Sequence, residues 1–232
     1  LIKNSTHYYE VNYHSGSAPS SAGNFAARCV GSLGNSLKVS MCIGSNAYSQ
    51  SIASAINDTD IQVTNTTIVV ADGSKFQVGD IIRFQGQTDN YKISEISANT
   101  LTFGLIGDPA QGLLVAPSNG DSITRAWEFA GSFTKAPGTS PDATANSTSF
   151  DELHIVVVDE DGKITGIPGE VLEVFEGLSL ASDAKDADGN SNYYVDKVRY
   201  NSNYIFWTNH DSTAADAGST FAAAGADFTR GT

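Results

Sequence analysis

Between residues 60 and 128, short runs rich in β-branched and aromatic residues alternate with turn sequences. The turns include Asp72-Gly73 and the sequence from Val78 to Asp80. β-branched and aromatic side chains favour strands, whereas Gly, Asn and Asp permit the backbone angles of tight turns. The series therefore predicts five or six short strands that fold as a small β-barrel or sandwich. Residues 119–127 read as its last turn and strand, so we place an inserted β module at 59–127.

The segments on either side of this module have weaker patterns. The alternating stretch 8–13 predicts a strand, and the Ser/Gly/Pro-rich residues after it predict a loop. Residues 50–57 are compatible with one or two helical turns, although the segment is short. The composition of 131–148 is typical of an irregular exposed loop, and that of 209–232 of a surface loop.

The C-terminal half contains the clearest hairpin pattern of the chain. Residues 154–158 form a buried-strand run, 159–162 read as a hairpin turn, and 163–167 are expected to pair back. Residues 169–180 fit a helical turn and a bulged strand about equally. Residues 193–200 favour a short helix, and 204–207 a buried strand. We expect 1–58 and 128–232 to form one discontinuous domain, so the predicted fold class is β-rich α+β, with a mixed sheet and helix parent domain.

Residues 26–43 predict a strand after a tight turn. Gly31 and Gly34 permit the turn, and the strand that follows alternates between two faces. We read Cys29 and Cys42 as reduced thiols in or near the core, although a disulfide between them is conceivable because they flank the turn. The two faces of the strand are Leu37, Val39 and Met41 on one side and Lys38, Ser40 and Cys42 on the other.

Composition and charge limit the classes of function. The chain has 232 residues, of which 40% are hydrophobic, which is enough to form a core. Its net charge is −13, and its Lys and Arg residues are scattered singly. No basic stripe is available to neutralise phosphates, so nucleic acid is not an expected partner. No apolar run has the roughly 18 residues of a membrane helix.

The residues that could carry chemistry do not form a recognisable site. The four histidines, at 7, 14, 154 and 210, are widely separated, and no nucleophile elbow or phosphate-binding loop is present. The run from Asp186 to Asn190 has part of a calcium-loop pattern, but position twelve of that register is Val195 instead of a bidentate Glu. We expect no catalytic, cofactor-binding or metal-binding residues, no cofactor and no enzymatic activity, and we read Trp127 and Trp207 as core residues.

Four segments form an ordered pattern along the chain. Gly31 to Val39 reads G-x-x-G-N-x-L-x-V, and Gly169 to Ser179 reads G-E-x-x-E-x-F-x-x-L-S. An acidic Gly/Asn run, 183–192, follows, and Tyr194 to Ile205 reads Y-V-x-x-V-x-x-x-S-x-Y-I. In this order, the segments resemble the middle region of the tail sheath proteins of contractile-tailed bacteriophages. The resemblance covers 26–49 and 145–210, and the insert at 59–127 lies outside it.

This resemblance implies a structural protein of the virion tail that is assembled in the host cytoplasm. Its partners would be other copies of the sheath subunit and the tail tube, and contraction would drive the tube through the host envelope for genome ejection. Energy stored in subunit contacts requires no catalytic step. The chain has no initiator Met, so we expect a segment of a longer protein. Because nothing in it matches the family's C-terminal joint region, we expect it to be a monomer alone.

An alternative is a carbohydrate- or receptor-binding β module of a viral or cell-surface protein. The loops at 104–120 and 131–148 would then present the binding groups. Phe133 is their only aromatic residue, whereas sugar sites usually need stacking rings. The sheath interpretation is therefore preferred.

Overall fold

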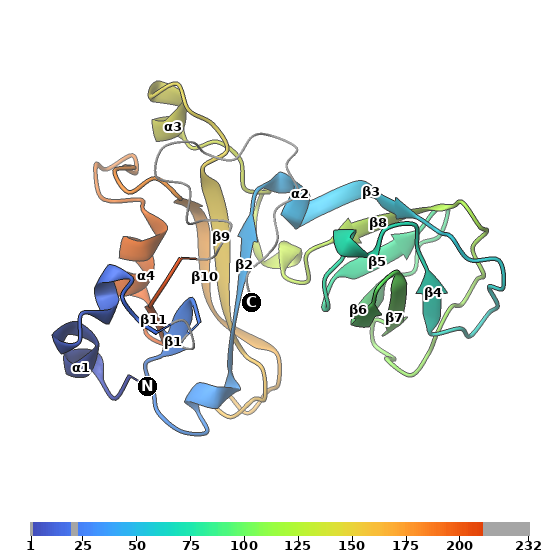
Figure 1. The fold of residues 1–232 in the computed structure, drawn as a ribbon, viewed down its shortest axis with the longest axis horizontal. Coiled ribbons are helices and arrows are strands. Elements are labelled where there is room, and N and C mark those ends of the chain that lie inside the picture. The colour runs from blue at the N-terminus through green and yellow to red at the C-terminus, as the bar shows by residue number, and fades with distance from the viewer. Residues whose placement is uncertain (1, 20–22, 211–232) are drawn as a thin grey trace. The chain divides into compact units, whose positions relative to one another are not determined.

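The computed structural model describes residues 2–19 and 23–210. The chain divides into two compact units, Leu1–Ser45 with Lys135–Thr232, and Asn46–Thr134. Within these residues, three antiparallel sheets and a few short helices make a β-rich α+β fold, as the sequence predicts. Figure 1 labels these elements. The loop expected at 209–232 falls almost entirely outside the described residues.

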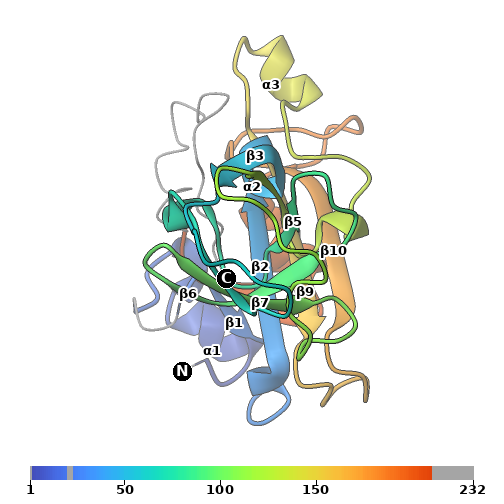
Figure 2. The same cartoon turned by 90° about the vertical axis from the view of Figure 1, so that its right-hand side faces the viewer.

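The first unit is built on a three-stranded antiparallel sheet. Its order is β10 (Glu170–Ser179), β9 (Glu152–Asp159), β2 (Leu37–Ile43). All eight residues of β9 are buried, and the three strands run alongside one another in Figure 2. The last four residues of β2, including Ser40 and Cys42, are buried as well, so that half of the strand is covered on both faces.

A second, two-stranded sheet and short helices complete this unit. Strand β1 (Phe25–Ala27) pairs with β11 (Ile205–Trp207), and helix α4 (Tyr194–Asn201) precedes β11. The predicted helix at 193–200 and the buried strand at 204–207 are therefore confirmed. The main core of the unit contains the buried residues Met41, Ile43, Leu153, Ile155, Val157, Leu178, Leu180, Tyr194, Val195, Val198, Ile205 and Trp207.

The strand predicted at 8–13 is wrong, because this segment begins with a helix. Helix α1 spans Ser5–Glu10, and a 3₁₀ helix, η1, spans Tyr13–Ser15. Asn4 caps α1 by accepting the His7 N–H at 2.8 Å. Tyr8 is fully buried, and its ring stacks on Phe206 with a centroid separation of 4.5 Å. Capping and this aromatic contact outweigh the apparent two-residue period of the sequence.

The hairpin has a different return strand from the predicted one. Residues 163–167 lie in a turn, and β10 is the strand that pairs back, with Glu170 opposite Asp159. The Asp159 carboxylate accepts the backbone N–H groups of Ile164 and Thr165, which holds these residues in the turn. Register shifts interrupt β10 in two places, so the bulged-strand interpretation of 169–180 is confirmed.

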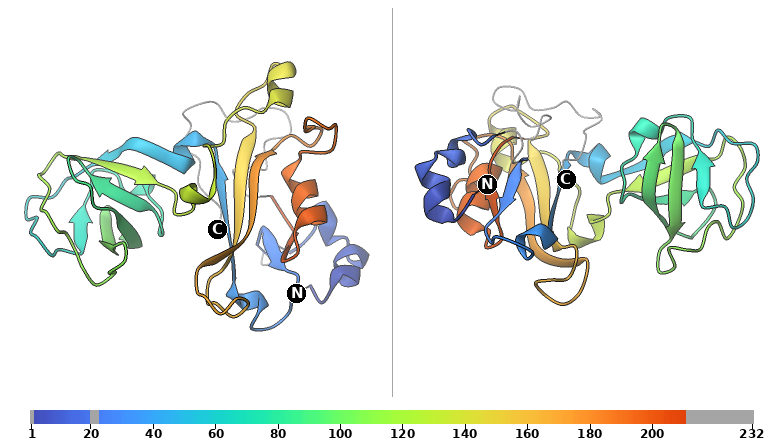
Figure 3. Two further views of the ribbon diagram at one scale, coloured as in Figure 1. Left: turned by 180° about the vertical axis from the view of Figure 1, so that it is seen from behind. Right: turned by 60° about the horizontal axis from the view of Figure 1, so that its bottom comes forward.

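The second unit is a six-stranded antiparallel sheet, whose strands are seen from two sides in Figure 3. Its order is β3-β8-β5-β6-β7-β4. Short helices α2 (Ser45–Tyr48), η4 (Gly73–Lys75) and η5 (Ala130–Ser132) lie between its strands or at its ends. The strands are β3 (Ser49–Ala55), β4 (Thr67–Val69), β5 (Ile81–Phe84), β6 (Tyr91–Ser97), β7 (Thr100–Leu105) and β8 (Ser122–Ala126).

The helical turns predicted at 50–57 are wrong, because β3 occupies this segment and pairs with β8. Ile56 and Ala53 belong to the core of the second unit, with aromatic residues such as Phe84 and Phe103. Burial and pairing therefore decide the conformation of a segment whose own sequence has little strand preference. For the same reason, this compact unit spans 46–134, which is wider than the expected 59–127.

The loops are more ordered than their composition predicts. Within 131–148, helix α3 (Pro141–Ala145) begins at Ser140, whose side chain accepts the Ala143 N–H at 3.0 Å. In the loop 104–120, Leu113 is fully buried. A Cβ on Gly112 would lie 2.3 Å from the Asn65 carbonyl oxygen. These residues anchor the loops to their units.

Candidate functional site

The histidines do not form a catalytic arrangement among the described residues. His154 is fully buried, and its Nδ1 accepts the Gly177 N–H at 3.0 Å while Nε2 lies 2.8 Å from the Lys135 carbonyl oxygen. The Nδ1 of His210 lies 2.6 Å from the Tyr194 hydroxyl, and burial lowers the pKa of His210. His7 and His14 belong to the N-terminal helices. The rings of His154 and His210 therefore hold local structure.

Asp159 is the centre of a buried polar cluster. Its carboxylate accepts the Ser36 hydroxyl at 2.5 Å, the Thr165 N–H at 2.7 Å and the Ile164 N–H at 2.9 Å. Burial alone raises the pKa of Asp159, but the hydrogen bonds from Ser36, Thr165 and Ile164 outweigh it and hold the pKa well below its usual range. The charged carboxylate thus joins the turn before β2 to the loop after β9.

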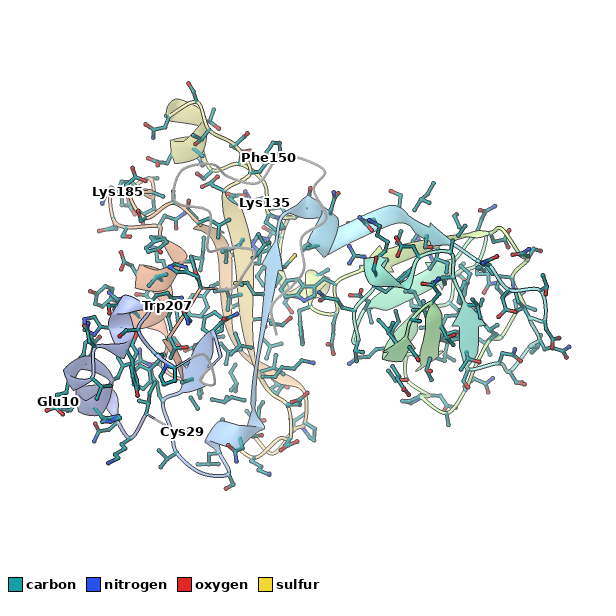
Figure 4. The ribbon with its side chains drawn as sticks, viewed as in Figure 1. Glu10, Cys29, Lys135, Phe150, Lys185 and Trp207 are labelled. Carbon is teal, nitrogen blue, oxygen red and sulfur yellow. The ribbon has the colours of Figure 1, made fainter. Side chains whose placement is uncertain are left out.

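A second buried carboxylate, Asp151, lies just before β9. It accepts the Ser140 N–H at 2.8 Å, the Ser140 hydroxyl at 2.7 Å and the Ser179 hydroxyl at 2.5 Å. The neighbouring Glu152 accepts the Lys135 ammonium at 3.0 Å and the Gly138 N–H at 2.9 Å. Lys135 is labelled in Figure 4. These contacts hold in place helix α3 and the segment from Lys135 to Ser140, where the chain re-enters the first unit.

The cysteines are both free thiols, Cys42 in the core and Cys29 half-buried. Cys29 helps to line a cavity of about 310 Å³ beside the turn at 31–34. The side chains around it are mainly apolar and include Ile2, Tyr13 and Pro19. No general base lies among the residues that line it, so this cavity has no catalytic constellation within the described part of the chain.

The acidic loop 183–192 is organised by Asp186. This carboxylate accepts the Asn190 N–H at 2.9 Å, the Asp188 N–H at 3.1 Å and the Lys197 ammonium at 3.0 Å. The hydrogen bond from Lys197 is the main cause that lowers the pKa of Asp186. Over residues 2–19 and 23–210, no group of three or more His, Cys, Asp or Glu side chains could hold a metal ion.

The aromatic residues named from the sequence are core residues. Trp127 and Trp207 are buried, and Phe133 stacks on Trp127 with a centroid separation of 5.1 Å. Phe206 is buried between Tyr8 and the guanidinium of Arg28, which lies 4.3 Å from the ring centroid. None of these rings forms an exposed platform for a sugar.

A groove lined by both polar and apolar residues lies within the second unit, across β3, β8 and β5. Its volume is about 430 Å³. Arg83 lies opposite Thr124, and Gln50 opposite Arg125 in the strand pairings that form it. Arg125 is buried and forms an ion pair with Asp80 at 3.6 Å. The lining residues are Ser49, Gln50, Ser51, Ile81, Ile82, Arg83, Asn90, Thr124, Arg125 and Ala126.

Sequence reasoning missed both the groove and the buried carboxylates. Asp151 and Asp159 flank a run in which five of seven residues are apolar, which is a usable signal, because an acid at the end of a buried strand must find hydrogen-bond donors. The groove has no comparable signal, since its residues come from four separate stretches of the chain.

Comparisons with known proteins identify no relative. No family model matches this chain, and neither a curated protein nor a solved structure matches it. Among the helices that the structure describes, none is long and apolar enough to cross a membrane.

Proposed function

We propose that this chain is the middle portion of a tail sheath subunit of a contractile-tailed bacteriophage. The observation that supports it is the meeting of the resembling segments in one core. Leu37 and Val39, Leu172 and Leu178, and Val195 with its neighbours in α4 pack in the same cluster, although they come from distant parts of the sequence. Because the motifs share one core, they belong to the same domain, the parent domain of the resemblance.

Under this proposal, the chain acts mechanically and not as an enzyme. Asp159 and Asp151 each tie separate loops to the central strand β9 through buried hydrogen bonds. Such contacts stiffen a subunit, because breaking one leaves a buried charge without its donors. Stiff subunits that exchange one set of lattice contacts for a better one can drive a tail tube through an envelope without a chemical step in this chain. Its partners are other sheath subunits and the tube, in the virion tail.

We further propose that the inserted module is a small closed barrel. β3 and β4 are the first and last strands in the order of its sheet. Beyond their ends, Ile56 bridges to Val70 in antiparallel fashion. The Asn57 N–H donates to the Val69 carbonyl at 2.9 Å, and the Ala71 N–H donates to the Ala55 carbonyl at 2.9 Å. These contacts support closure, which would leave no long free edge.

A second candidate function is a carbohydrate- or receptor-binding module. The loops at 104–120 and 131–148 offer it no stacking ring, since Phe133 is buried. One observation favours it, the groove on β3, β5 and β8, whose lining includes hydroxyl, amide and guanidinium groups. The two proposals are compatible, because a sheath subunit could carry a binding module.

Electron microscopy of the longer parent protein tests the main proposal. We expect helical tubes or rings, with antibodies against 46–134 decorating the outer surface. Light scattering on the chain of 232 residues should give a monomer, because its net charge of −13 disfavours self-association. A parent protein that stays monomeric under all assembly conditions, or a module that lines the tube, would contradict the proposal.

A further inference from the structure

The groove on β3, β5 and β8 has the composition of a binding site for a polar ligand. Three hydroxyl groups, on Ser49, Ser51 and Thr124, line it together with the amides of Gln50 and Asn90. Hydroxyl and amide groups both donate and accept hydrogen bonds, as the hydroxyls of a sugar do. Its volume of about 430 Å³ falls within the usual range of small-molecule sites.

The charge around the groove differs from that of the module as a whole. Residues 46–134 contain nine acidic and four basic residues, a net charge of −5. Two of those four basic residues, Arg83 and Arg125, nevertheless line this one groove, and none of its lining residues is acidic within the part of the chain that the structure describes. Asp80 offsets the charge of Arg125, so Arg83 supplies the local positive charge that favours an anionic group at this place.

The two arginines have different surroundings. Arg125 is buried, and its ion pair with Asp80 and its hydrogen bond to the Asn46 carbonyl oxygen fix it in place. Arg83 is exposed, and its guanidinium has no ion pair or hydrogen bond with any described residue. Because a guanidinium can form two parallel hydrogen bonds to one carboxylate, Arg83 is the group that a ligand carboxylate would contact.

We propose that this groove binds a hydroxyl-rich ligand with one carboxylate, the chemistry of an acidic sugar. Arg83 takes the carboxylate, while Thr124, Ser51 and Asn90 take the hydroxyls. Ile81 and Ala126 offer an apolar surface to the C–H face of the ring. Since no aromatic ring stacks on the ligand, we expect a dissociation constant on the order of 1 mM for a single sugar. This site would function on the module whether or not the chain is part of a tail sheath.

The test is a titration of the chain of 232 residues, followed by ¹H–¹⁵N NMR. Glucuronate carries both features of the ligand, glucose has only the hydroxyls, and acetate has only the carboxylate. We expect glucuronate to shift the signals of β3, β5 and β8 and to bind more tightly than either of the other two. No shift at these strands at about 20 mM glucuronate, or equally tight binding of acetate or glucose, would overturn the proposal.

Variants then assign the contact. Arg83→Gln should weaken glucuronate binding about tenfold, because it removes a charged hydrogen-bond pair, while its thermal midpoint stays unchanged. Arg83→Lys should retain part of the affinity. Lys185→Gln makes an equal charge change at an exposed position of the other unit and should leave binding unchanged. If Arg83→Gln and Lys185→Gln have the same effect on binding, the proposed site is wrong.

Discussion

Ser36 and Asp159 lie 123 positions apart in the sequence and are joined by a buried hydrogen bond of 2.5 Å from the Ser36 hydroxyl to Oδ1 of Asp159. The same hydroxyl accepts the backbone N–H groups of Asp161 at 3.2 Å and Lys163 at 3.3 Å. One serine thus connects the turn before β2 to the loop after β9. The connection links the two segments of the first unit between which the second unit is inserted.

Removal of the Ser36 hydroxyl should therefore destabilise the first unit. Ser36→Ala leaves the Asp159 carboxylate without one donor and two backbone N–H groups without their acceptor, so we expect a loss of about 1 to 3 kcal/mol of unfolding free energy. Ser182→Ala, at an exposed position of the same unit, should have little effect. Urea unfolding followed by circular dichroism measures both. Equal stabilities of the two variants would contradict the role of this contact.

Acid should weaken the same cluster. The folded-state pKa of Asp159 is held below its unfolded value, so the carboxylate contributes stability above about pH 4, and this contribution is lost as the pH falls toward the folded-state pKa. Asp159→Asn keeps the side-chain size but removes the charge, so it should lower the melting temperature at pH 7 and reduce its decrease between pH 5 and pH 2. Melting curves across this range give the comparison. An unchanged acid dependence in the variant would show that other carboxylates control it.

The elements that the sequence predicted correctly are those whose pattern agrees with their burial. The alternation from Leu37 and the aromatic run ending at Trp207 both lie in strands that pack on the core. The prediction for β3 was wrong because its Ser- and Ala-rich sequence has little strand preference. Its conformation is determined by pairing with β8, more than 65 positions away. The prediction for α1 was wrong because the alternation of Tyr9, Val11 and Tyr13 with polar residues suggested a strand, although the capping residue Asn4 was visible in the sequence.

The Asp159 cluster and the groove depend on long-range contacts more than the individual helices and strands do. Asp159 could be identified as an acid beside a buried strand, but its partner Ser36 could not, because nothing local in the chain connects them. Arg83 and Gln50 share a groove only because β8 pairs with both β5 and β3. To predict a contact between distant strands, one must know the sheet order, which local sequence patterns do not contain.

The two glycines of the turn before β2 should respond differently to substitution. Gly31 has a φ of +82° with open space around a new Cβ, so Gly31→Ala should cost only the backbone strain, about 1 kcal/mol. A Cβ on Gly34 would lie 2.2 Å from the Cys29 carbonyl oxygen, so Gly34→Ala must displace backbone and should cost about 3 kcal/mol. Chemical unfolding of both variants provides the measurement. A larger loss of unfolding free energy for Gly31→Ala than for Gly34→Ala would show that Gly34 does not lie close to the Cys29 carbonyl.

Calcium should not stabilise the acidic loop 183–192. Its central carboxylate, Asp186, already accepts two backbone N–H groups and the Lys197 ammonium, so a cation would have to displace these donors. A ligand at 100 times its dissociation constant adds about 2.7 kcal/mol, which a melting experiment detects easily. We expect the melting temperature in millimolar calcium to equal that in chelator. A rise of several degrees that chelator reverses would contradict this prediction.

The boundaries of the inserted module can be tested with two fragments. Residues 46–134 include β3, whose pairing with β8 and whose neighbour Ile56 complete the six-stranded sheet and its core. Residues 59–134 lack β3, so β8 loses one partner strand and the core loses Ala53 and Ile56. Burial of these groups stabilises a small domain that has little stability to spare.

We therefore expect the fragment 46–134 to unfold in one cooperative thermal transition with an all-β circular dichroism spectrum. The fragment 59–134 should unfold at a lower temperature or lack a transition, because an unpaired β8 exposes both its backbone groups and the apolar side chains behind it. Ile56→Ala in the longer fragment removes part of the same core contact and should lower the free energy of unfolding by about 2 to 5 kcal/mol. Equal melting temperatures for the two fragments would show that β3 is dispensable and that the module begins after it.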